Sequence, residues 1–267
     1  MSATSSDTDS PLLLYTHKPW TCPYHQRIWI TALEKGIYNR LNLVDIPDPW
    51  SKPKELLAVN PRKGLVPCLV HNDHSIPESS VIIQYLAEAF SNSGTSLIPS
   101  DPWQRAQLRL WTSRIDREVA CTFYHVLLLA NEKESVEKRD QLWKEMLTHL
   151  KDFTMEMDTR GPYFFPGNQL SLLDIQLIPY ALRLELVYPH YFPSYRVEQK
   201  WVTPVLGDDT SAWVTRYRQW LTAVRLHPNV KATVPTDMQM LIQSYERYTQ
   251  QTLDKAFMEN VKKGILQ

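Results

Sequence analysis

The chain has 267 residues, equal numbers of basic and acidic side chains (29 each) and an apolar fraction of 43%. This length suits one large domain or two modest ones, and the balanced charge gives no general attraction for nucleic acid or an anionic membrane. No apolar run reaches the roughly 18–20 residues that span a bilayer, and the polar start lacks the features of a secretory signal. Three cysteines are too few for a disulfide framework, so we expect a reducing, cytoplasmic location.

The first 91 residues alternate strand and helix patterns. We interpret residues 1–10, which are polar and acidic, as a disordered tail. Strands are expected at 12–15, 41–46, 65–70 and 75–76, and helices at 23–35, 54–59 and 78–90. A strand, a helix and a strand of these lengths form a parallel pair with a right-handed crossover. The order βαβ, α, ββα predicts an α/β layer over residues 11–91.

A small-polar linker at 92–100 precedes a segment, 101–267, that has helical periodicity and no convincing strand. Helices are expected from Pro102 past Val119, around 142–153, and at 172–186, 212–226 and 238–248. The third of these is apolar nearly all round, which places it at the centre of a bundle. Ser171 and Asp174 have the spacing of a capping box, with Asp in place of the usual Glu or Gln.

Cys22 lies directly after the first strand and directly before a helix that begins at Pro23. Proline suits the first helical position, so Cys22 becomes the N-cap, where the positive end of the helix favours a thiolate. Such cysteines have pKa values lowered to roughly 3.5–7.5, and we expect Cys22 to be a nucleophile near neutral pH. His25 stands where a Cys-x-x-Cys motif has its second cysteine. An external thiol, of which glutathione is the abundant one, must therefore resolve a mixed disulfide on Cys22.

Two further features suit a peptide ligand. Pro67 removes a hydrogen-bond donor from an apolar strand, and a cis Val66–Pro67 bond would turn the backbone of Val66 outward to pair with an extended peptide. Glu78 and Ser79 open a helix whose free N–H groups suit a carboxylate, while Glu78 can instead hold an ammonium. An edge strand at Pro67 and plain helix capping at Glu78 are the alternatives. Together these features suit a γ-glutamyl peptide.

The runs CPYHQR (22–27), NPRKGLVP (60–67), Glu78-Ser79 and GNQLSLLD (167–174), continued at 179–185, resemble the omega class of glutathione transferases. The resemblance covers residues 11–230 and implies that family's fold: a thioredoxin-like N-terminal domain and an all-helical domain that walls a hydrophobic substrate site. It implies that Cys22 is the catalytic cysteine. The residues it assigns to glutathione binding are Tyr24, Lys52, Val66, Pro67, Glu78 and Ser79. Those expected at the substrate wall are Trp20, Tyr124, Tyr180 and Arg183.

A cysteine in this position attacks a glutathionylated sulfur or carbon, and a second glutathione releases the resulting protein–glutathione disulfide. We therefore expect thiol transfer, dehydroascorbate reduction and reductive deglutathionylation, with weak conjugation, in a homodimer. Two alternatives are ligandin-type carriage of aromatic small molecules between the domains, and an intracellular chloride-channel relative with a similar Cys-Pro-aromatic start. The first helix is too short and too polar to enter a membrane, which disfavours the chloride-channel alternative. The histidines show no metal-ligand spacing, so no metal is expected.

Overall fold

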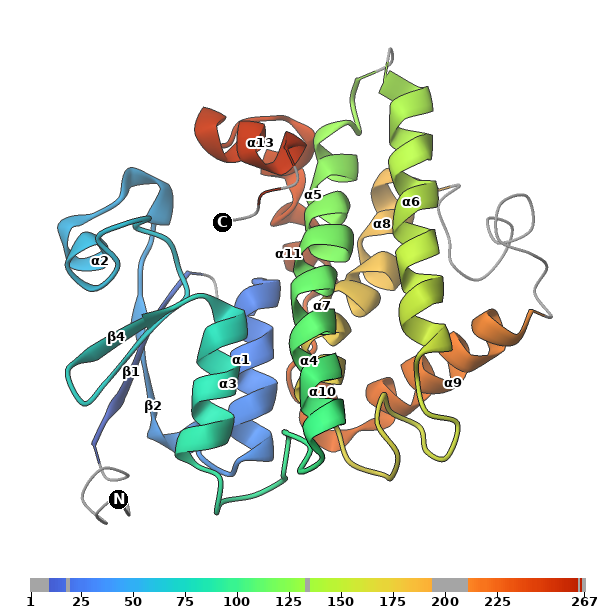
Figure 1. Cartoon of the computed structure of the whole chain (residues 1–267). Coiled ribbons are helices and arrows are strands. Elements are labelled where there is room, and N and C mark those ends of the chain that lie inside the picture. The colour runs from blue at the N-terminus through green and yellow to red at the C-terminus, as the bar shows by residue number, and fades with distance from the viewer. Residues whose placement is uncertain (1–9, 18–19, 133–134, 194–210, 264, 266–267) are drawn as a thin grey trace.

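The computed structural model describes residues 10–17, 20–132, 135–193, 211–263 and 265. They form a four-stranded mixed sheet with helices against it, followed by an assembly of helices (Figure 1). This is the predicted fold class, a thioredoxin-like layer joined to a helical part. The expected tail lies outside the described residues apart from Ser10. The division of the chain at 11–91, 92–100 and 101–267 remains a proposal.

The sheet has the strand order β2-β1-β3-β4. Its strands are β1 Leu12–Thr16, β2 Leu41–Asp45, β3 Cys68–His71 and β4 His74–Pro77. The pair β1 and β2 is parallel, as expected, and the pairs β1–β3 and β3–β4 are antiparallel. The third strand begins three residues later than expected, because Leu65, Val66 and Pro67 form a loop beside the sheet. Burial alternates along β1, so one face of this strand is fully covered and the other partly.

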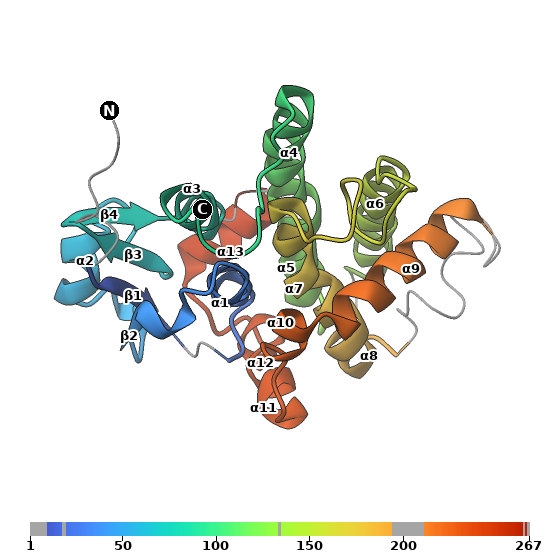
Figure 2. The ribbon, with the colours of Figure 1, turned by 90° about the horizontal axis from the view of Figure 1, so that it is seen from below.

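Three helices and two short turns accompany the sheet. The helices are α1 Pro23–Glu34, α2 Lys54–Val59 and α3 Ser79–Ala89, and the turns are Tyr38–Arg40 (η1) and Pro49–Ser51 (η2). Helices α1 and α3 lie side by side on one face of the sheet, between it and the helical part (Figures 1 and 2). Helix α1 therefore contacts both halves of the molecule, and its N-terminal end carries Cys22.

The helical part begins with α4 Pro102–Arg114, which continues through a π-helical segment, η3 Ile115–Ala120, into α5 Cys121–Leu128. The remaining helices are α6 Val136–Met155, α7 Leu172–Leu186, α8 Tyr188–Tyr191, α9 Ala212–Leu226, α10 Pro228–Lys231, α11 Met238–Gln243, α12 Glu246–Thr249 and α13 Lys255–Lys262. The bounds of α7 and α9 are those expected from the sequence. The single helix expected at 238–248 is two short helices, and α13 follows them.

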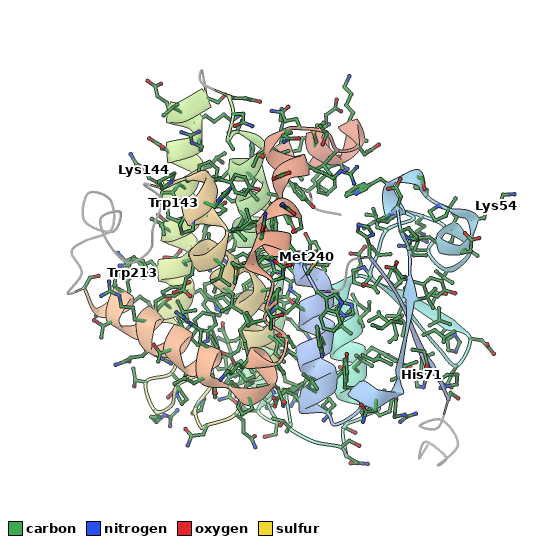
Figure 3. The ribbon with its side chains drawn as sticks, turned by 180° about the vertical axis from the view of Figure 1, so that it is seen from behind. Lys54, His71, Trp143, Lys144, Trp213 and Met240 are labelled. Atoms are coloured by element: carbon green, nitrogen blue, oxygen red, sulfur yellow. The ribbon has the colours of Figure 1, made fainter. Side chains whose placement is uncertain are left out.

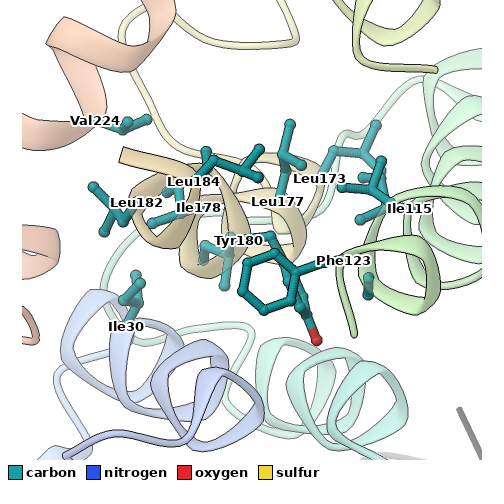
Figure 4. Packing of buried hydrophobic residues seen from close by; sticks show 14 of the residues in the cluster. Ile30, Ile115, Phe123, Leu173, Leu177, Ile178, Tyr180, Leu182, Leu184 and Val224 are labelled. Atoms are coloured by element: carbon teal, nitrogen blue, oxygen red, sulfur yellow. The ribbon is translucent and has the colours of Figure 1, made fainter. Parts of the chain in front are cut away.

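Helix α7 is the centre of the core, as its apolar sequence predicts. Ser171 and Asp174 form the expected capping box, in which each side chain accepts a hydrogen bond from the backbone N–H of the other. Figure 4 shows Tyr180 of α7 beside Phe123 of α5, and Ile30 of α1 on the side of α7 that carries Leu182. One hydrophobic cluster thus runs from the sheet-side helices into the helical part, which fixes the position of α1 against α7.

Figure 3 shows the side chains from behind the view of Figure 1, with Trp143 and Trp213 in the helical part and Lys54 projecting outward from α2. Trp143 is fully buried and Trp213 nearly so. Across the described ranges, no helix combines the length and the apolarity needed to cross a bilayer.

Candidate functional site

A cavity of about 160 Å³ lies between the sheet-side loops and the C-terminal helices. Its wall contains five of the residues expected to bind glutathione together with the expected nucleophile: Cys22, Tyr24, Val66, Pro67, Glu78 and Ser79. These residues come from the start of α1, the loop before β3 and the start of α3. The sheet brings the three segments together because β1 and β3 are neighbours and α1 and α3 pack on the same face.

Cys22 is the N-cap of α1, and Pro23 is its first helical residue, as the sequence indicates. Cys22 as a residue is half-buried and lies on the cavity wall. Its side chain makes no capping bond, and the backbone N–H groups of His25 and Tyr24 are directed at the sulfur. Cys68 and Cys121 are buried in β3 and α5, and burial raises the pKa of their thiols to about 11 and about 12. Of the three thiols, Cys22 alone lines the cavity.

The expected lowering of the Cys22 pKa is not found. Burial raises this pKa above its usual value, and that effect exceeds the opposing influence of the two backbone N–H groups, Arg183 and Arg27. The helix end and the two cations act in the expected direction, yet the surrounding protein removes the water that would solvate a thiolate. His25 does not stabilise the thiolate electrostatically, because burial lowers the pKa of His25 to about 4 and its ring is neutral near pH 7.

The Val66–Pro67 peptide bond is cis, as expected. Within the described part of the chain, neither the N–H nor the C=O of Val66 has a hydrogen-bond partner. An unpaired backbone N–H and C=O beside a cavity can pair with the extended backbone of a peptide. The neighbouring loop is held by Asn60, whose side chain donates to the carbonyl of Leu65 at 3.0 Å.

Glu78 and Ser79 form the start of α3. Glu78 has φ 73° and ψ 116°, a conformation that a non-glycine residue rarely adopts and that often marks a functional site. Its carboxylate pairs with Lys63 at 2.8 Å. The N–H groups of Ser79 and Ser80 begin the helix without an intrahelical acceptor, which suits a carboxylate ligand.

Arg27 lies beneath these residues and joins the two halves of the molecule. Its buried guanidinium donates to the Ser79 hydroxyl at 3.2 Å and to the carbonyl of Gln176 in α7 at 3.0 Å. It also pairs with Asp116 of the π-helical segment at 2.8 Å. Because Arg27 occupies one lone pair of the Ser79 oxygen, the hydroxyl proton is free to be donated towards the cavity.

Four of the expected site residues lie outside the cavity wall. Lys52 is exposed, and its side chain packs against Gly64. Trp20 is 51% exposed and packs edge-on against Trp29. Tyr180 is fully buried in the core behind Tyr24.

Arg183 is the fourth, and it is buried behind the wall with its hydrogen bonds directed to other protein groups. Arg183 is far along the chain from the segments that form the cavity, so its place behind the wall could not be predicted from the sequence. Tyr124 does line the cavity, although it is almost fully buried.

Further residues line the cavity that were not expected from the sequence, among them an aromatic wall on the side away from Val66. They are His17, Pro49, Trp50, Asn60, Ser244, Tyr245, Arg247, Tyr248, Leu253 and Phe257. The rings of Trp50 and Phe257 meet edge to face with centroids 4.8 Å apart, so α13 reaches across to the sheet side. The apolar spacing of Phe257, Met258 and Val261 after a capping Asp254 is the signal that identifies this helix.

Comparison with known proteins identifies relatives of this chain. Residues 21–89 match the family model described as "Glutathione S-transferase, N-terminal domain". The chain is 31% identical over 161 residues to glutathione S-transferase U28 of Arabidopsis thaliana, which covers 60% of this chain and 68% of the relative. It is 27% identical over 227 residues to glutathione S-transferase 3 of Glycine max, covering 84% and 92% of the two chains.

Solved structures of two classes resemble the chain. Glutathione transferase Omega 3C from Trametes versicolor is 27% identical, with a TM-score of 0.67 over 90% of this chain and 92% of that one. The Tau class glutathione S-transferase from mango, Mangifera indica, is 25% identical, with a TM-score of 0.71 over 92% of this chain and all of that one. The described strands and helices are therefore arranged as in both structures.

Proposed function

Since the chain belongs to the glutathione S-transferase family, we propose that it is a glutathione-dependent thiol transferase and deglutathionylating reductase in which Cys22 is the nucleophile. One observation carries this proposal: a cysteine at the N-terminus of α1 shares a cavity wall with Val66, Glu78 and Ser79. A serine or tyrosine hydroxyl in that place would stabilise the thiolate of bound glutathione, whereas a cysteine can form a covalent bond to it.

Glutathione has groups that match this wall. The backbone N–H and C=O of Val66 would pair with its cysteinyl residue, and the start of α3 would hold the γ-glutamyl carboxylate. Glu78 would hold the γ-glutamyl ammonium once that group competes with Lys63. Pro67 and Tyr24 complete the wall beside the thiol. Lys52 keeps no assigned role, because it lies off the wall.

In the proposed reaction the Cys22 thiolate attacks the glutathione sulfur of a mixed disulfide. The sulfur–sulfur bond of the substrate breaks, and the released thiolate leaves with its electron pair and takes a proton from water. Cys22 is then bonded to glutathione. The thiolate of a second glutathione attacks that bond, which yields oxidised glutathione and restores the Cys22 thiolate. Dehydroascorbate reduction uses the same pair of glutathione thiols as its source of two electrons.

The class within the family follows from the cysteine. We assign the chain to the cysteine type, similar to the omega class, on the basis of Cys22 and the Val66–Pro67 segment. The likeness to a Tau class structure supports the shared fold equally well. The activity of Cys22, and not the overall similarity, is therefore the feature that separates the two assignments.

The test is the mass of the protein after incubation with oxidised glutathione. We expect one glutathione adduct on the peptide that contains Cys22, and a Cys22→Ser variant should lose the adduct and at least about 99% of the thiol transferase activity. The buried thiols Cys68 and Cys121 serve as internal controls and should stay unmodified. Full activity in Cys22→Ser would refute the proposal.

A second function is favoured by the aromatic wall. Tyr124, Tyr245, Tyr248, Trp50 and Phe257 line one side of the cavity and could bind a planar aromatic molecule without any reaction. This is the ligandin-type alternative, and both functions can coexist. Binding of an aromatic dye that persists in Cys22→Ser would support carriage. A homodimer, a cytoplasmic location and the absence of a metal remain predictions.

A further inference from the structure

A buried cation behind the cavity has no anionic partner. Arg183 of α7 is 2% exposed, and none of the ion pairs in the described part of the chain includes it. Its guanidinium donates to the Gln26 side chain at 2.6 Å, to the Thr21 carbonyl at 2.7 Å and to the Pro179 carbonyl at 2.9 Å. All these acceptors are neutral. A buried charge without a counterion is costly, so an anion close to Arg183 would be stabilised.

The fourth hydrogen-bond partner of Arg183 is a residue of the cavity wall. Its Nε donates to the hydroxyl oxygen of Tyr245 at 2.5 Å. Tyr245 lies between α11 and α12, and its side chain lines the same cavity as Cys22. Another nitrogen of the same guanidinium holds the carbonyl of Thr21, the residue that precedes Cys22. Arg183 therefore ties the phenol of Tyr245 to the backbone that carries the thiol.

This arrangement orients the phenol. A tyrosine hydroxyl has one proton to donate and accepts with its lone pairs. Because Arg183 donates to the oxygen, the proton of Tyr245 must be directed to a different acceptor. The cavity side holds Cys22 and Tyr124, whose hydroxyl is within hydrogen-bonding reach of the Tyr245 phenol. An anionic sulfur is a stronger acceptor than a neutral hydroxyl. Burial raises the pKa of Tyr245 to about 12, so the phenol keeps its proton at neutral pH and remains a donor.

We propose that the Tyr245 hydroxyl, oriented by Arg183, donates a hydrogen bond to the Cys22 sulfur and stabilises its thiolate. The proposal rests on Cys22 being the nucleophile of the proposed function, and it names a catalytic group outside residues 21–89. Tyr245 keeps its proton throughout, and no bond to it forms or breaks. The hydrogen bond forms when Cys22 is anionic, before it attacks a disulfide and again when a second glutathione releases it. Such a bond offsets part of the cost of a buried thiolate.

Alkylation of Cys22 by iodoacetamide at pH 8.0, followed by mass spectrometry, tests the hydrogen bond without glutathione. Loss of one charged hydrogen bond raises the thiol pKa by about one unit, which is tenfold in thiolate. The more basic thiolate is also more nucleophilic, with a Brønsted coefficient of about 0.4–0.5. Tyr245→Phe should therefore slow alkylation about threefold. Tyr191→Phe is the matched control, because its hydroxyl anchors the same segment at the Ile242 carbonyl (2.8 Å) away from the cavity.

The outcomes separate this proposal from the function itself. Slower alkylation in Tyr245→Phe and an unchanged rate in Tyr191→Phe would support the hydrogen bond. Equal rates in all three proteins, or equal slowing in both variants, would overturn it. If Tyr245→Phe does not fold by circular dichroism, Arg183→Lys is the second variant and should slow alkylation likewise. Arg183 holds Tyr245, Gln26 and Thr21 through three different nitrogens, and a single ammonium nitrogen does not span those positions. Failure of the parent to form a glutathione adduct would refute the proposed function alone.

Discussion

The sulfur of Cys22 experiences two opposing influences. Surrounding protein raises its pKa, while the start of α1 and two arginines lower it, and the first effect is the larger. The sign of the pH dependence follows: the reactive thiolate is the deprotonated form, so a pKa above the usual 9.0 leaves most sulfurs protonated at neutral pH. Reactivity must then increase as the pH rises towards that pKa.

We expect the rate of Cys22 alkylation in the absence of glutathione to increase about tenfold per pH unit between pH 6 and pH 8. No plateau should appear below pH 9.0. Alkylation is followed by mass spectrometry of the Cys22 peptide, with glutathione itself alkylated under the same conditions as the reference for a free thiol. A plateau near neutral pH would show that the helix end and the arginines outweigh burial.

The position of Cys22 could be predicted from the sequence, and its pKa could not. A cysteine before a proline at the start of a helix is a local pattern, and the structure has Cys22 as the N-cap of α1. The pKa depends on desolvation by groups from distant parts of the chain. Tyr124, Tyr245 and Tyr248 reach the same cavity from 100 or more residues away. The resemblance placed Arg183 at the substrate wall, but it lies behind that wall, because its hydrogen-bond partners Thr21 and Gln26 come from a distant part of the chain.

At the scale of elements, local signals predicted α7 and α9 best, because a cap or a proline marks one end of each and each is 15 residues long. The capping box at Ser171 and the proline at position 228 fixed α7 and α9 to the residue. The C-terminal helices α11, α12 and α13 are short, and their stability comes from packing and not from helix propensity. Rings of α12 and α13 pack against Tyr124 of α5, and the ring centroids of Tyr248 and Tyr124 lie 4.8 Å apart. In short helices held by such contacts the apolar pattern covers only one or two turns, so it is easily overlooked even where a cap such as Asp254 is present.

Helix α13 contributes Phe257 to the aromatic wall, and substitution of this residue tests the role of the wall. An aromatic pair contributes about 0.5–1.5 kcal/mol beyond its buried area. Phe257→Ala, which removes the edge-to-face contact with Trp50, should raise the dissociation constant of an anilinonaphthalene sulfonate dye about fivefold. Glutathione binding should stay within about twofold, because Val66, Glu78 and Ser79 lie on the sheet side. Fluorescence titration measures the dye, and calorimetry measures glutathione.

Met258→Ala is the control for that experiment. Met258 is the next residue of α13 and packs against the core without lining the cavity. If both variants weaken dye binding equally, the effect comes from loosening of α13 as a whole. Unchanged or tighter dye binding in Phe257→Ala would mean that the aromatic wall does not hold the ligand.

Over the whole molecule, polar contacts between the sheet side and the helical part converge on α1. Gln26 bonds to Thr233 and Arg183, and Glu34 accepts from Asn229 at 2.6 Å. Arg27 makes the ion pair with Asp116. Sequence patterns of single elements cannot predict such pairs, because each partner is an ordinary polar residue on its own helix. The fold class could be predicted, whereas the side chains that join its two parts could not.

The ion pair at this junction gives the last prediction. Arg27 is fully buried and Asp116 is 20% exposed, so removing the carboxylate leaves a charge without its counterion. Breaking a buried pair in this way costs about 3–5 kcal/mol. We expect Asp116→Asn to lower the free energy of unfolding by about 3 kcal/mol, at the lower end of that range because Asp116 is partly solvated and because Arg27 also lies over the rings of Tyr24 and Tyr180.

Denaturation in urea, monitored by circular dichroism, measures this loss. Asp152→Asn is the matched control, since Asp152 is half exposed and lies 3.5 Å from Arg114 in the same helical part. A surface pair of that kind contributes at most about 1 kcal/mol. Because Arg27 also orients the Ser79 hydroxyl, Asp116→Asn should weaken glutathione binding as well, which Asp152→Asn should not. Equal stability losses in the two variants would mean that Arg27 finds its compensation elsewhere, from the tyrosine rings or from solvent.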